Sequence, residues 1–288
     1  MKSLVSIAGF DASSGAGVVR DVDTFFSFGF HGIAVPTCTV VQGPGGVKRV
    51  EASSEGLFRD VLRAATTGIA VKGVKIGVLC DESHVRATAG FLARRRGVPV
   101  VLDPVFAAKN GVPLITDEAR AACIDVLFEK VTVITPNAEE ASAITGVKVR
   151  TVKAARKAAE KLRSLGPGAV IVKGGHLEGD PVDILFDGRE YLLYRKTRFP
   201  RLIHGTGCSF SSALACFLAA GYPLTDAFVA TQRYLERLFE SSYRIDRKGY
   251  FYVSSATEAA SDTAGECMKI QGAHGRLPQD PGPLRIWR

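Results

Sequence analysis

The chain alternates short runs of apolar residues with stretches that have helical spacing. Runs rich in Val, Ile and Leu lie at residues 4–8, 32–41, 71–77, 98–102, 131–135, 169–173 and 182–186. Between several of them, residues 83–96, 117–128 and 151–164 have the spacing of helices. Strands that alternate with helices form right-handed βαβ units, and they are apolar throughout because helices cover both faces of the sheet. We therefore predict an α/β fold with a mostly parallel central sheet and helices on both faces.

The end of this predicted sheet is antiparallel. Residues 182–186 and 191–195 form two apolar runs, and the Asp-Gly pair between them is a hairpin signal. Two long helical stretches follow at residues 207–220 and 224–243, and they are long enough to cover one face of the sheet.

The last part of the chain differs in character. From Ser254 to Arg288 the sequence is rich in Gly, Ala, Pro and small polar residues, and its periodicity is weak. We predict one domain over residues 1–253 and an irregular extension of unknown role over residues 254–288.

Length and composition fit a folded protein of the cytoplasm. The 288 residues are 46% hydrophobic and 23% charged, which leaves little room for extensive disorder. No run approaches the roughly 18 apolar residues of a membrane span, and no signal-type segment follows Met1. Six cysteines without a CxxC pair indicate free thiols in a reducing compartment rather than a zinc site.

The chain is basic, with 37 Lys and Arg against 29 Asp and Glu and a net charge of +8. Apart from Arg94-Arg95-Arg96 and one face of the helical stretch near residues 150–163, the basic residues are dispersed. Solvated helix faces explain this pattern better than a nucleic-acid footprint does. An anionic small-molecule substrate is equally compatible with the charge.

A glycine turn precedes the helical stretch at residues 207–220. Gly205-Thr206-Gly207-Cys208 allows a sharp turn, so the first free N–H groups of the helix, and its dipole, face whatever occupies the turn. We predict an anion hole, in which the same amides favour the thiolate of Cys208 and suit it to take a proton from an attacking hydroxyl. A glycine-capped helix start with an inert cysteine explains the same residues.

Further polar residues fall at the predicted carboxyl ends of strands, the edge at which open α/β sheets bind ligands. Asp103 and Lys173 each end a strand. Asn137 and Glu140, at i and i+3, suit water-mediated magnesium binding, although a plain helix cap explains them equally well. The small residues of the loop at residues 8–17 would let a ligand approach the backbone, but the loop matches neither GxGxxG nor Walker A.

Several short segments, taken together in their order along the chain, are more specific than any one of them. They are Ala8-Gly9, Ser14-Gly15-Ala16-Gly17, Val41-Gln42, Lys75-Ile76-Gly77, Leu102-Asp103-Pro104-Val105, Ala108-Lys109-Asn110-Gly111, Thr135-Pro136-Asn137, Val172-Lys173-Gly174-Gly175-His176 and Gly205-Thr206-Gly207-Cys208. This set resembles the hydroxymethylpyrimidine/phosphomethylpyrimidine kinases, thiamine-biosynthesis enzymes of the ribokinase superfamily. The resemblance covers roughly residues 3–245.

The resemblance implies a ribokinase-like fold and roles for the residues that match the family's motifs. The matching residues are Gly9, Ala16, Asp21, Val40, Gln42, Val78 and Val105 at the pyrimidine pocket, Asp103 and Glu140 at the magnesium, Lys173, Asn137 and Thr206 at the nucleotide phosphates, and Gly205, Thr206, Gly207 and Cys208 at the anion hole. In the pocket, Asp21 and Gln42 would supply the polar contacts. Cys208 stands where sugar kinases of the superfamily have an aspartate base.

Two segments depart from the family's usual pattern. Residues 11–17 read Asp-Ala-Ser-Ser-Gly-Ala-Gly where the family usually has Asp-Pro-Ser-Gly-Gly-Ala-Gly. Residues 42–44 read Gln-Gly-Pro where the family usually has Gln-Asn-Thr. Both departures lie beside the expected substrate pocket, so they bear on substrate preference.

The resemblance implies a kinase that uses ATP and Mg²⁺ to phosphorylate 4-amino-5-hydroxymethyl-2-methylpyrimidine and then its monophosphate. A pyridoxal or pyridoxine kinase of the same fold is an alternative, because its substrate is also a flat, hydroxymethylated nitrogen heterocycle. A non-catalytic pyrimidine or nucleotide sensor is a second alternative. We expect small-molecule partners, no nucleic acid and no membrane, and a homodimer formed through the exposed hairpin edge near residues 182–195.

Overall fold

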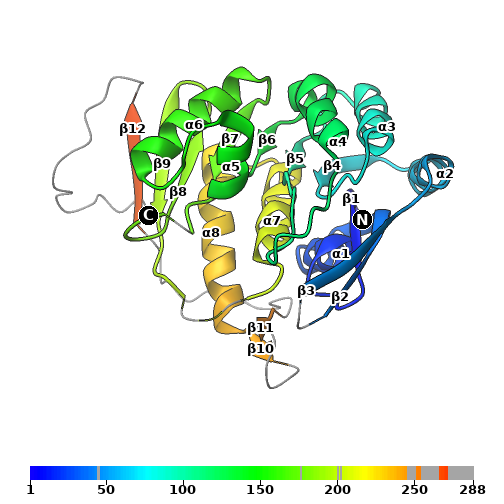
Figure 1. The fold of residues 1–288 in the computed structure, drawn as a ribbon, viewed down its shortest axis with the longest axis horizontal. Helices are drawn as coiled ribbons and strands as arrows, with labels where there is room; N and C mark the ends of the chain where they lie inside the picture. The colour runs from blue at the N-terminus through cyan, green and yellow to red at the C-terminus, as the bar shows by residue number, and fades with distance from the viewer. Residues whose placement is uncertain are drawn as a thin grey trace.

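A computed structural model of the chain describes residues 1–43, 46–175, 177–199, 201, 203–244 and 251–253, and the backbone of residues 266–271. Its centre is a ten-stranded sheet in the order β12-β9-β8-β7-β6-β5-β4-β1-β2-β3 (Figure 1). The strands are β1 (Ser3–Asp11), β2 (His31–Gly43), β3 (Gly46–Ala52), β4 (Val71–Ile76), β5 (Val100–Leu102), β6 (Val133–Ile134), β7 (Ala169–Val172), β8 (Val182–Phe186), β9 (Glu190–Arg195) and β12 (Glu266–Gln271).

The middle of the sheet is parallel and both ends are antiparallel. The six strands from β7 to β2 run parallel to their neighbours. β8 and β9 form the predicted hairpin, which confirms the antiparallel edge. At the other end β3 pairs antiparallel with β2, a second hairpin that the sequence analysis did not predict.

Helices cover both faces of the sheet, as predicted. They are α1 (Gly17–Ser27), α2 (Glu55–Thr66), α3 (Glu82–Ala93), α4 (Asp117–Ala122), α5 (Ala138–Thr145), α6 (Val152–Ser164), α7 (Thr206–Ala220) and α8 (Leu224–Glu240). One buried cluster joins the sheet to α1, α7 and α8 through Phe25, Phe210 and Phe228. A second, larger cluster joins the opposite face to the helices from α2 to α6, through residues such as Phe58 and Leu162. The sheet is therefore the middle of three layers, and its apolar strands are buried on both sides.

Two predicted helices end differently from the sequence pattern. The stretch at residues 117–128 begins as α4, where the Thr116 hydroxyl caps the Ala119 amide, and then continues as a π-turn over Cys123–Leu127 and a 3-10 turn over Phe128–Lys130. The stretch that was predicted to run to residue 243 ends at Glu240, and Tyr243–Arg244 form β10, which pairs with β11 (Phe251–Tyr252).

The prediction of an irregular extension after Ser254 is wrong for one segment. β12 pairs antiparallel with β9, from Glu266 opposite Arg195 to Gln271 opposite Glu190. An added strand pairs with the backbone N–H and C=O groups that an edge strand would leave exposed. The weak side-chain periodicity of this segment did not reveal that it forms a strand. The hairpin edge that suggested a dimer is therefore covered, and the remainder of the predicted extension lies outside the described residues.

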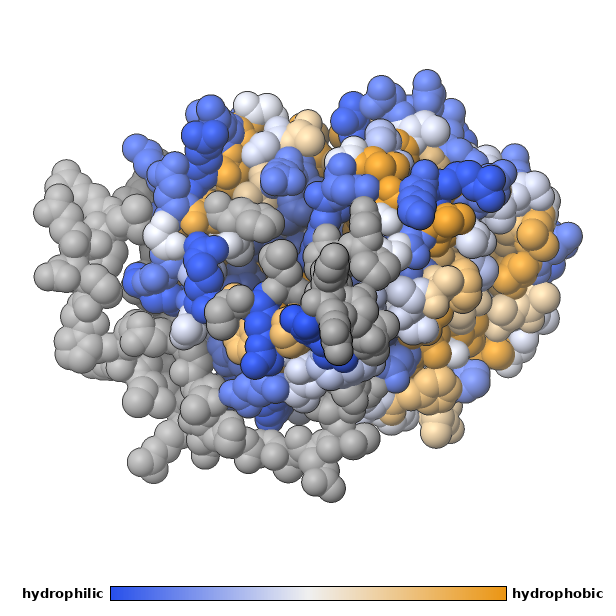
Figure 2. Space-filling view, turned by 60° about the horizontal axis from the view of Figure 1, so that its bottom comes forward, coloured by the Kyte–Doolittle hydropathy of each residue, from blue (hydrophilic) through white to orange (hydrophobic). Residues whose placement is uncertain are grey.

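Two further features concern the hydropathy of the helices and of the surface. Among the described helices, none has the length and hydropathy that crossing a membrane requires. Hydrophobic surface gathers at the end of the molecule that α1, β2 and β3 form (Figure 2), where Phe10, Phe26 and Val41 are exposed.

Candidate active site

The chemistry-bearing residues meet at one edge of the parallel sheet. Asp11 ends β1, Gln42 lies at the end of β2, Asp103 follows β5 and Lys173 follows β7. The chain order reverses between β1 and β4, because β1 lies between β2 and β4 in the sheet. In open α/β sheets such a switch point, at the carboxyl ends of the strands, is where ligands bind. Two groups of residues lie along this edge.

The first group, here called the phosphate-side cluster, consists of Asp103, Asn137, Glu140 and Lys173. Lys173 Nζ lies 2.6 Å from Asp103 Oδ1, and the Thr135 hydroxyl donates to the same oxygen at 3.2 Å. Burial alone would lower the pKa of Lys173, but the Asp103 and Glu140 carboxylates outweigh it, so the pKa is raised. The lysine is therefore held as a cation in a mostly buried position.

The glycine turn at residues 205–208, the predicted anion hole, lies next to this ion pair. Gly205 has φ 77° at the N-cap of α7, in the left-handed region, and a Cβ there would collide with the Gly15 carbonyl. A Cβ at Gly207 would lie 3.3 Å from Asp103 Oδ2 and 3.4 Å from Lys173 Nζ. The N-terminus of α7 and the Lys173 ammonium thus supply positive charge to the same place, where a phosphate would be stabilised.

Asn137 and Glu140 form a complete capping box at the start of α5. The Asn137 side chain accepts from the Glu139 and Glu140 amides, and Glu140 Oε2 accepts from the Asn137 amide at 2.8 Å. The helix-cap explanation of these residues is therefore observed. Burial raises the pKa of Glu140 to about 7, although the Lys173 ammonium acts in the opposite direction.

The donor set of this cluster fits a magnesium ion bound partly through water. Asp103 and Glu140 supply carboxylate oxygens, the ligands that Mg²⁺ prefers, and the two carboxylates are close enough to raise the cost of ionising Glu140. A cation between them would relieve that repulsion. No group of three or more potential ligand side chains converges in the described part of the chain, so water would have to complete the coordination.

Cys208 is the accessible thiol of the described cysteines. Cys38, Cys80, Cys123 and Cys216 are buried, whereas Cys208 is half-buried. The prediction that the helix amides favour its thiolate is wrong for this structure. Desolvation dominates and raises the pKa of Cys208, while the Lys75 ammonium and a hydrogen bond from the Gly17 amide only partly offset it.

A buried ion pair lies beneath this site. Lys75 and Asp21 are both fully buried, with Lys75 Nζ 2.7 Å from Asp21 Oδ2. The Ser6 and Ser212 hydroxyls also donate to the Asp21 carboxylate, at 2.5 and 2.8 Å. Asp21 is therefore held by three side chains in this structure, and its contact with the substrate stays a prediction. From the sequence, Lys75 belongs only to the Lys75-Ile76-Gly77 segment, and nothing in its apolar strand indicates a charged partner.

The second group, here called the substrate-side cluster, consists of Asp11, Gln42 and His204. His204 Nε2 lies 3.0 Å from Asp11 Oδ2 and 3.1 Å from Gln42 Nε2. Because a carboxylate only accepts, His204 Nε2 donates to Asp11. Gln42 Nε2 is also a donor, so it makes no hydrogen bond to this ring nitrogen and donates to Asp11 instead. Burial would raise the pKa of Asp11, but hydrogen bonds from His204, Ser13 and Gln42 together lower it.

The loop after β1 is shaped around these side chains. Asp11 also accepts from the Ser13 and Ala16 amides, at 2.9 and 3.0 Å. Ser14 has φ 60°, the left-handed region, at the position where the family usually has glycine. A Cβ at Gly15 would collide with the His204 ring. Two loops almost 200 residues apart are thus locked together, and the sequence analysis singled out neither Asp11 nor His204.

The expected apolar lining of the pocket gathers beside this cluster. Val40 belongs to a small buried cluster with Cys38 and Cys80, and Val78 and Val105 pack against it. A Cβ at Gly9 would lie 3.0 Å from Cys38 Sγ and 3.3 Å from Val40. A side chain at position 9 would therefore crowd Cys38 and Val40.

The segment after β5 lies across this apolar cluster. Lys109 Nζ donates to the Ile203 carbonyl at 3.0 Å, and Asn110 Nδ2 donates to the Val47 carbonyl at 2.9 Å. These two contacts tie the segment to the loop before α7 on one side and to β3 on the other. The segment is therefore held between the β2–β3 hairpin and the loop before α7.

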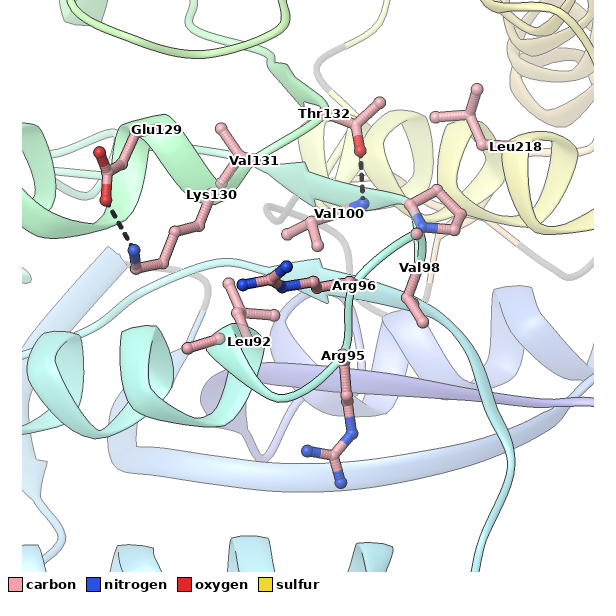
Figure 3. Close-up of a pocket in the computed structure, with 13 residues that line it drawn as sticks. Leu92, Arg95, Arg96, Val98, Val100, Glu129, Lys130, Val131, Thr132 and Leu218 are labelled. Carbon is pink, nitrogen blue, oxygen red and sulfur yellow. Dashed lines mark hydrogen bonds and ion pairs between the residues drawn. The ribbon is translucent and has the colours of Figure 1, made fainter.

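A separate cavity of about 650 Å³ lies at the opposite ends of the strands (Figure 3). It is lined by the start of β5 and by the turn before β6, and Thr132 Oγ1 accepts from the Val100 amide there. None of the predicted site residues lines it. The site described above is thus defined by convergent polar groups and not by this cavity.

Comparisons with known proteins decide between the possible readings of this geometry. The family model described as phosphomethylpyrimidine kinase matches residues 11–253. The chain belongs to this kinase family. A hydroxymethylpyrimidine/phosphomethylpyrimidine kinase of Aquifex aeolicus is 33% identical over 248 residues, which are 85% of this chain and 97% of the relative. One from Rhizobium meliloti is 37% identical over 245 residues, which are 84% of this chain and 92% of the relative.

Other relatives extend the comparison. A thiamine biosynthesis bifunctional protein of Geobacter sulfurreducens is 37% identical over 81% of this chain, and the chain spans about half (48%) of its length. A solved phosphomethylpyrimidine kinase of Clostridium difficile has a TM-score of 0.73 at 32% identity, covering 82% of this chain and 99% of its own. A Staphylococcus aureus pyridoxal kinase in complex with ADP has a TM-score of 0.85 at 25% identity, covering 94% of this chain and 99% of its own. The fold is that of the ribokinase-like kinases, and the chain is a kinase.

Proposed function

We propose that this kinase transfers the γ-phosphoryl group of ATP to the hydroxymethyl oxygen of 4-amino-5-hydroxymethyl-2-methylpyrimidine, and then to the phosphate of the product. The observation that carries this proposal is the position of Gly207 at the N-terminus of α7, where a Cβ would lie 3.3 Å from Asp103 Oδ2 and 3.4 Å from Lys173 Nζ. It puts a cation and free helix amides where transferred phosphate would carry charge. The names of the relatives, which pair hydroxymethylpyrimidine with phosphomethylpyrimidine, support both steps.

Different residues would have different roles in phosphoryl transfer. The amides of Gly205–Cys208 and the Lys173 ammonium would stabilise charge on the phosphoryl oxygens. Asn137 and Thr206 would position the nucleotide phosphates. Cys208 would accept the proton of the attacking hydroxyl. When bound, Mg²⁺ would neutralise phosphate charge, held by Asp103 and Glu140 with water completing its coordination.

The substrate-side cluster would bind the pyrimidine. Gln42 offers an amide that both donates and accepts, which suits the ring nitrogen and amino group of an aminopyrimidine. In this structure that amide lies next to His204 and Asp11, which would fix its orientation toward the ring. Gly9, Ala16, Val40, Val78 and Val105 would enclose the ring. Asp21, which is held by Ser212 in this structure, would supply a further polar contact to it.

Pyridoxal is the second candidate substrate, favoured by the structural similarity to the Staphylococcus aureus pyridoxal kinase. The test is coupled ADP release from ATP and Mg²⁺ with the hydroxymethylpyrimidine, its monophosphate, pyridoxal and ribose in parallel. We expect the two pyrimidines to have the highest kcat/KM. A higher kcat/KM for pyridoxal would replace the proposed substrate. Nucleotide binding without turnover on any of the four would favour a sensor.

The remaining expectations are proposals about context. We propose that residues 1–253 are the kinase domain and that residues 254–288 are an appendage whose β12 segment extends the sheet. We also propose a cytoplasmic homodimer that binds no nucleic acid. Because β12 covers the other edge, the apolar surface near Phe26 and Val41 now supports the dimer better than the hairpin edge does. Size-exclusion chromatography with light scattering tests this, and a monomer at micromolar concentration would refute it.

A further inference from the structure

A buried carboxylate, Asp183, lies behind the phosphate-side cluster and takes no part in the roles proposed above. Asp183 is on β8 and is fully buried. Its Oδ1 accepts from the Gly174 amide at 2.8 Å, and its Oδ2 accepts from Lys196 Nζ and Gln232 Nε2, each at 2.7 Å. A charge with this much burial is costly unless every oxygen is paired, as these are.

The Gly174 contact matters because of its neighbour in the chain. The peptide unit that joins Lys173 to Gly174 follows β7, and Lys173 extends from it to Asp103. On one side the Lys173 amide donates to the Pro136 carbonyl at 2.8 Å. On the other side the Gly174 amide donates to Asp183. Two hydrogen bonds therefore fix the backbone that carries Lys173: one to the Pro136 carbonyl and one to the Asp183 side chain.

The packing around Gly174 shows that this contact is built in. A Cβ at Gly174 would collide with the Val182 carbonyl, so the turn is pressed against β8 and only glycine fits. The Gln232 side chain, which reaches across from α8, gives its amide protons to Asp183, while its own Oε1 is buried without a partner in the described structure. An unpaired carbonyl is a cost that the carboxylate contact must outweigh.

We propose that Asp183 is a positioning residue that sets the direction of Lys173 toward the nucleotide phosphates by holding the Gly174 amide. The inference rests on the proposed function, since it assumes that Lys173 binds those phosphates. Asp183 touches neither substrate nor nucleotide. It acts through one backbone hydrogen bond, and Lys196 and Gln232 serve to keep its charge buried and paired.

The test compares variants that separate the Gly174 contact from the ion pair. Asp183→Ala removes both, whereas Lys196→Met removes the ion pair and leaves the carboxylate against Gly174. Asp183→Asn keeps an oxygen that can accept from Gly174 but loses the charge. We expect at least a tenfold rise in the KM for ATP in Asp183→Ala, with the KM for the second substrate within twofold of the parent. Asp183→Asn and Lys196→Met should stay within about threefold for ATP.

Two results would overturn the inference. One is a folded Asp183→Ala variant with the parent's KM for ATP. The other is a large rise in Asp183→Asn that Lys196→Met shares, because the charge and not the Gly174 contact would then be responsible. Amide hydrogen exchange in the parent protein adds a measurement that needs no variant: the Gly174 amide should be protected, and exchange at the open-chain rate would also overturn the inference.

Calorimetry with ADP separates this inference from the proposed function. If the parent protein binds ADP and Asp183→Ala binds it with equal affinity, only the inference about Asp183 fails. If the parent protein binds no nucleotide, the proposed function fails and the inference fails with it. Weaker ADP binding in Asp183→Ala than in Lys196→Met supports both.

Discussion

The two halves of the active-site edge are built in different ways. In the phosphate-side cluster, Asp103, Asn137 and Lys173 each lie within three residues of the end of a parallel strand, so the sheet spacing itself fixes their separation. In the substrate-side cluster, Gln42 belongs to a hairpin and His204 to the loop before α7, 162 residues away. The first half depends on strand ends alone, whereas the second combines the ends of β1 and β2 with a distant loop that carries His204.

This difference has a functional consequence. Phosphoryl transfer needs charges at fixed positions, and a three-layer sheet supplies a rigid frame for them. Recognition of the acceptor can vary between related kinases by changing loops, while the frame remains. We therefore expect substitutions in the phosphate-side cluster to lower turnover on every acceptor, and substitutions in the substrate-side cluster to change which acceptor is preferred.

The largest effect should come from Cys208, which lies between the two halves. Cys208→Ala removes the proposed proton acceptor, and loss of a general base typically lowers kcat about 10²- to 10⁴-fold. Because burial raises the pKa of this thiol, kcat/KM of the parent should still be rising with pH between about 7 and 9. Cys208→Asp, which carries the base of the sugar kinases, should reach its plateau at lower pH. A parent profile that is flat over this range would remove Cys208 from the proton transfer.

The next largest effect should come from Lys173, and it should change kcat/KM for ATP and not the KM for the acceptor. Lys173→Ala removes a cation from the phosphate site and leaves Asp103 buried without its partner, so we expect kcat/KM for ATP to fall about 10²- to 10³-fold. The KM for the acceptor should change little. Lys109→Met is the matched control, because Lys109 is a partly buried lysine near the acceptor pocket that contacts the Ile203 carbonyl. An equal loss in both variants would contradict the division into two halves.

The same division explains what the sequence could predict. Residues at strand ends, such as Asp103 and Lys173, are found from the pattern because each apolar run shows where its strand stops. The Asp-Gly signal found the β8–β9 hairpin, but the Gly-rich turn between β2 and β3 carried no alternating pattern strong enough to reveal the second hairpin. The order of the short segments then pointed to the kinase family, which the comparisons confirm.

What the sequence could not predict are partners that depend on tertiary structure. Lys75 lies in an apolar strand, and only the fold brings it to Asp21, 54 residues away. The contact of His204 with Asp11 spans 193 residues. The pKa of Cys208 depends on desolvation by the whole site, which the local helix-dipole argument omitted. Each of these errors arose because a local rule was applied where distant residues decide.

A smaller effect, confined to the acceptor, is expected at Gln42. Gln42→Leu removes the amide and leaves polar groups of an aminopyrimidine unpaired, which should raise its KM about 10- to 100-fold with the KM for ATP unchanged. His204→Phe, which removes a hydrogen bond to Asp11 while keeping a ring against the Gly15 loop, should give a weaker rise in the same constant. Unchanged acceptor constants in both variants would mean that the pyrimidine binds elsewhere.

The smallest effect concerns the pH dependence of stability through Glu140. Its folded-state pKa of about 7 lies above the ordinary value of 4.5, so the folded protein binds more protons than the unfolded chain between these pH values. The stabilisation is therefore complete below about pH 4.5 and is lost as pH rises through about 7. Glu140→Gln keeps the capping box, because glutamine at N3 can still accept from the Asn137 amide.

The variant should consequently lose about 2 kcal/mol of the change in stability between pH 5 and pH 7.5, which corresponds to about 4 to 8 °C in Tm. Glu139→Gln is the control, because Glu139 is the exposed neighbour in the same helical turn and should behave as the parent does. Added Mg²⁺ should also flatten the parent's profile, since the ion binds the ionised carboxylate and offsets its repulsion by Asp103. A change in Tm between pH 5 and pH 7.5 that is equal in Glu140→Gln and in the parent would show that Glu140 does not cause it. A Mg²⁺ effect of equal size in Glu140→Gln would take this carboxylate out of the metal site.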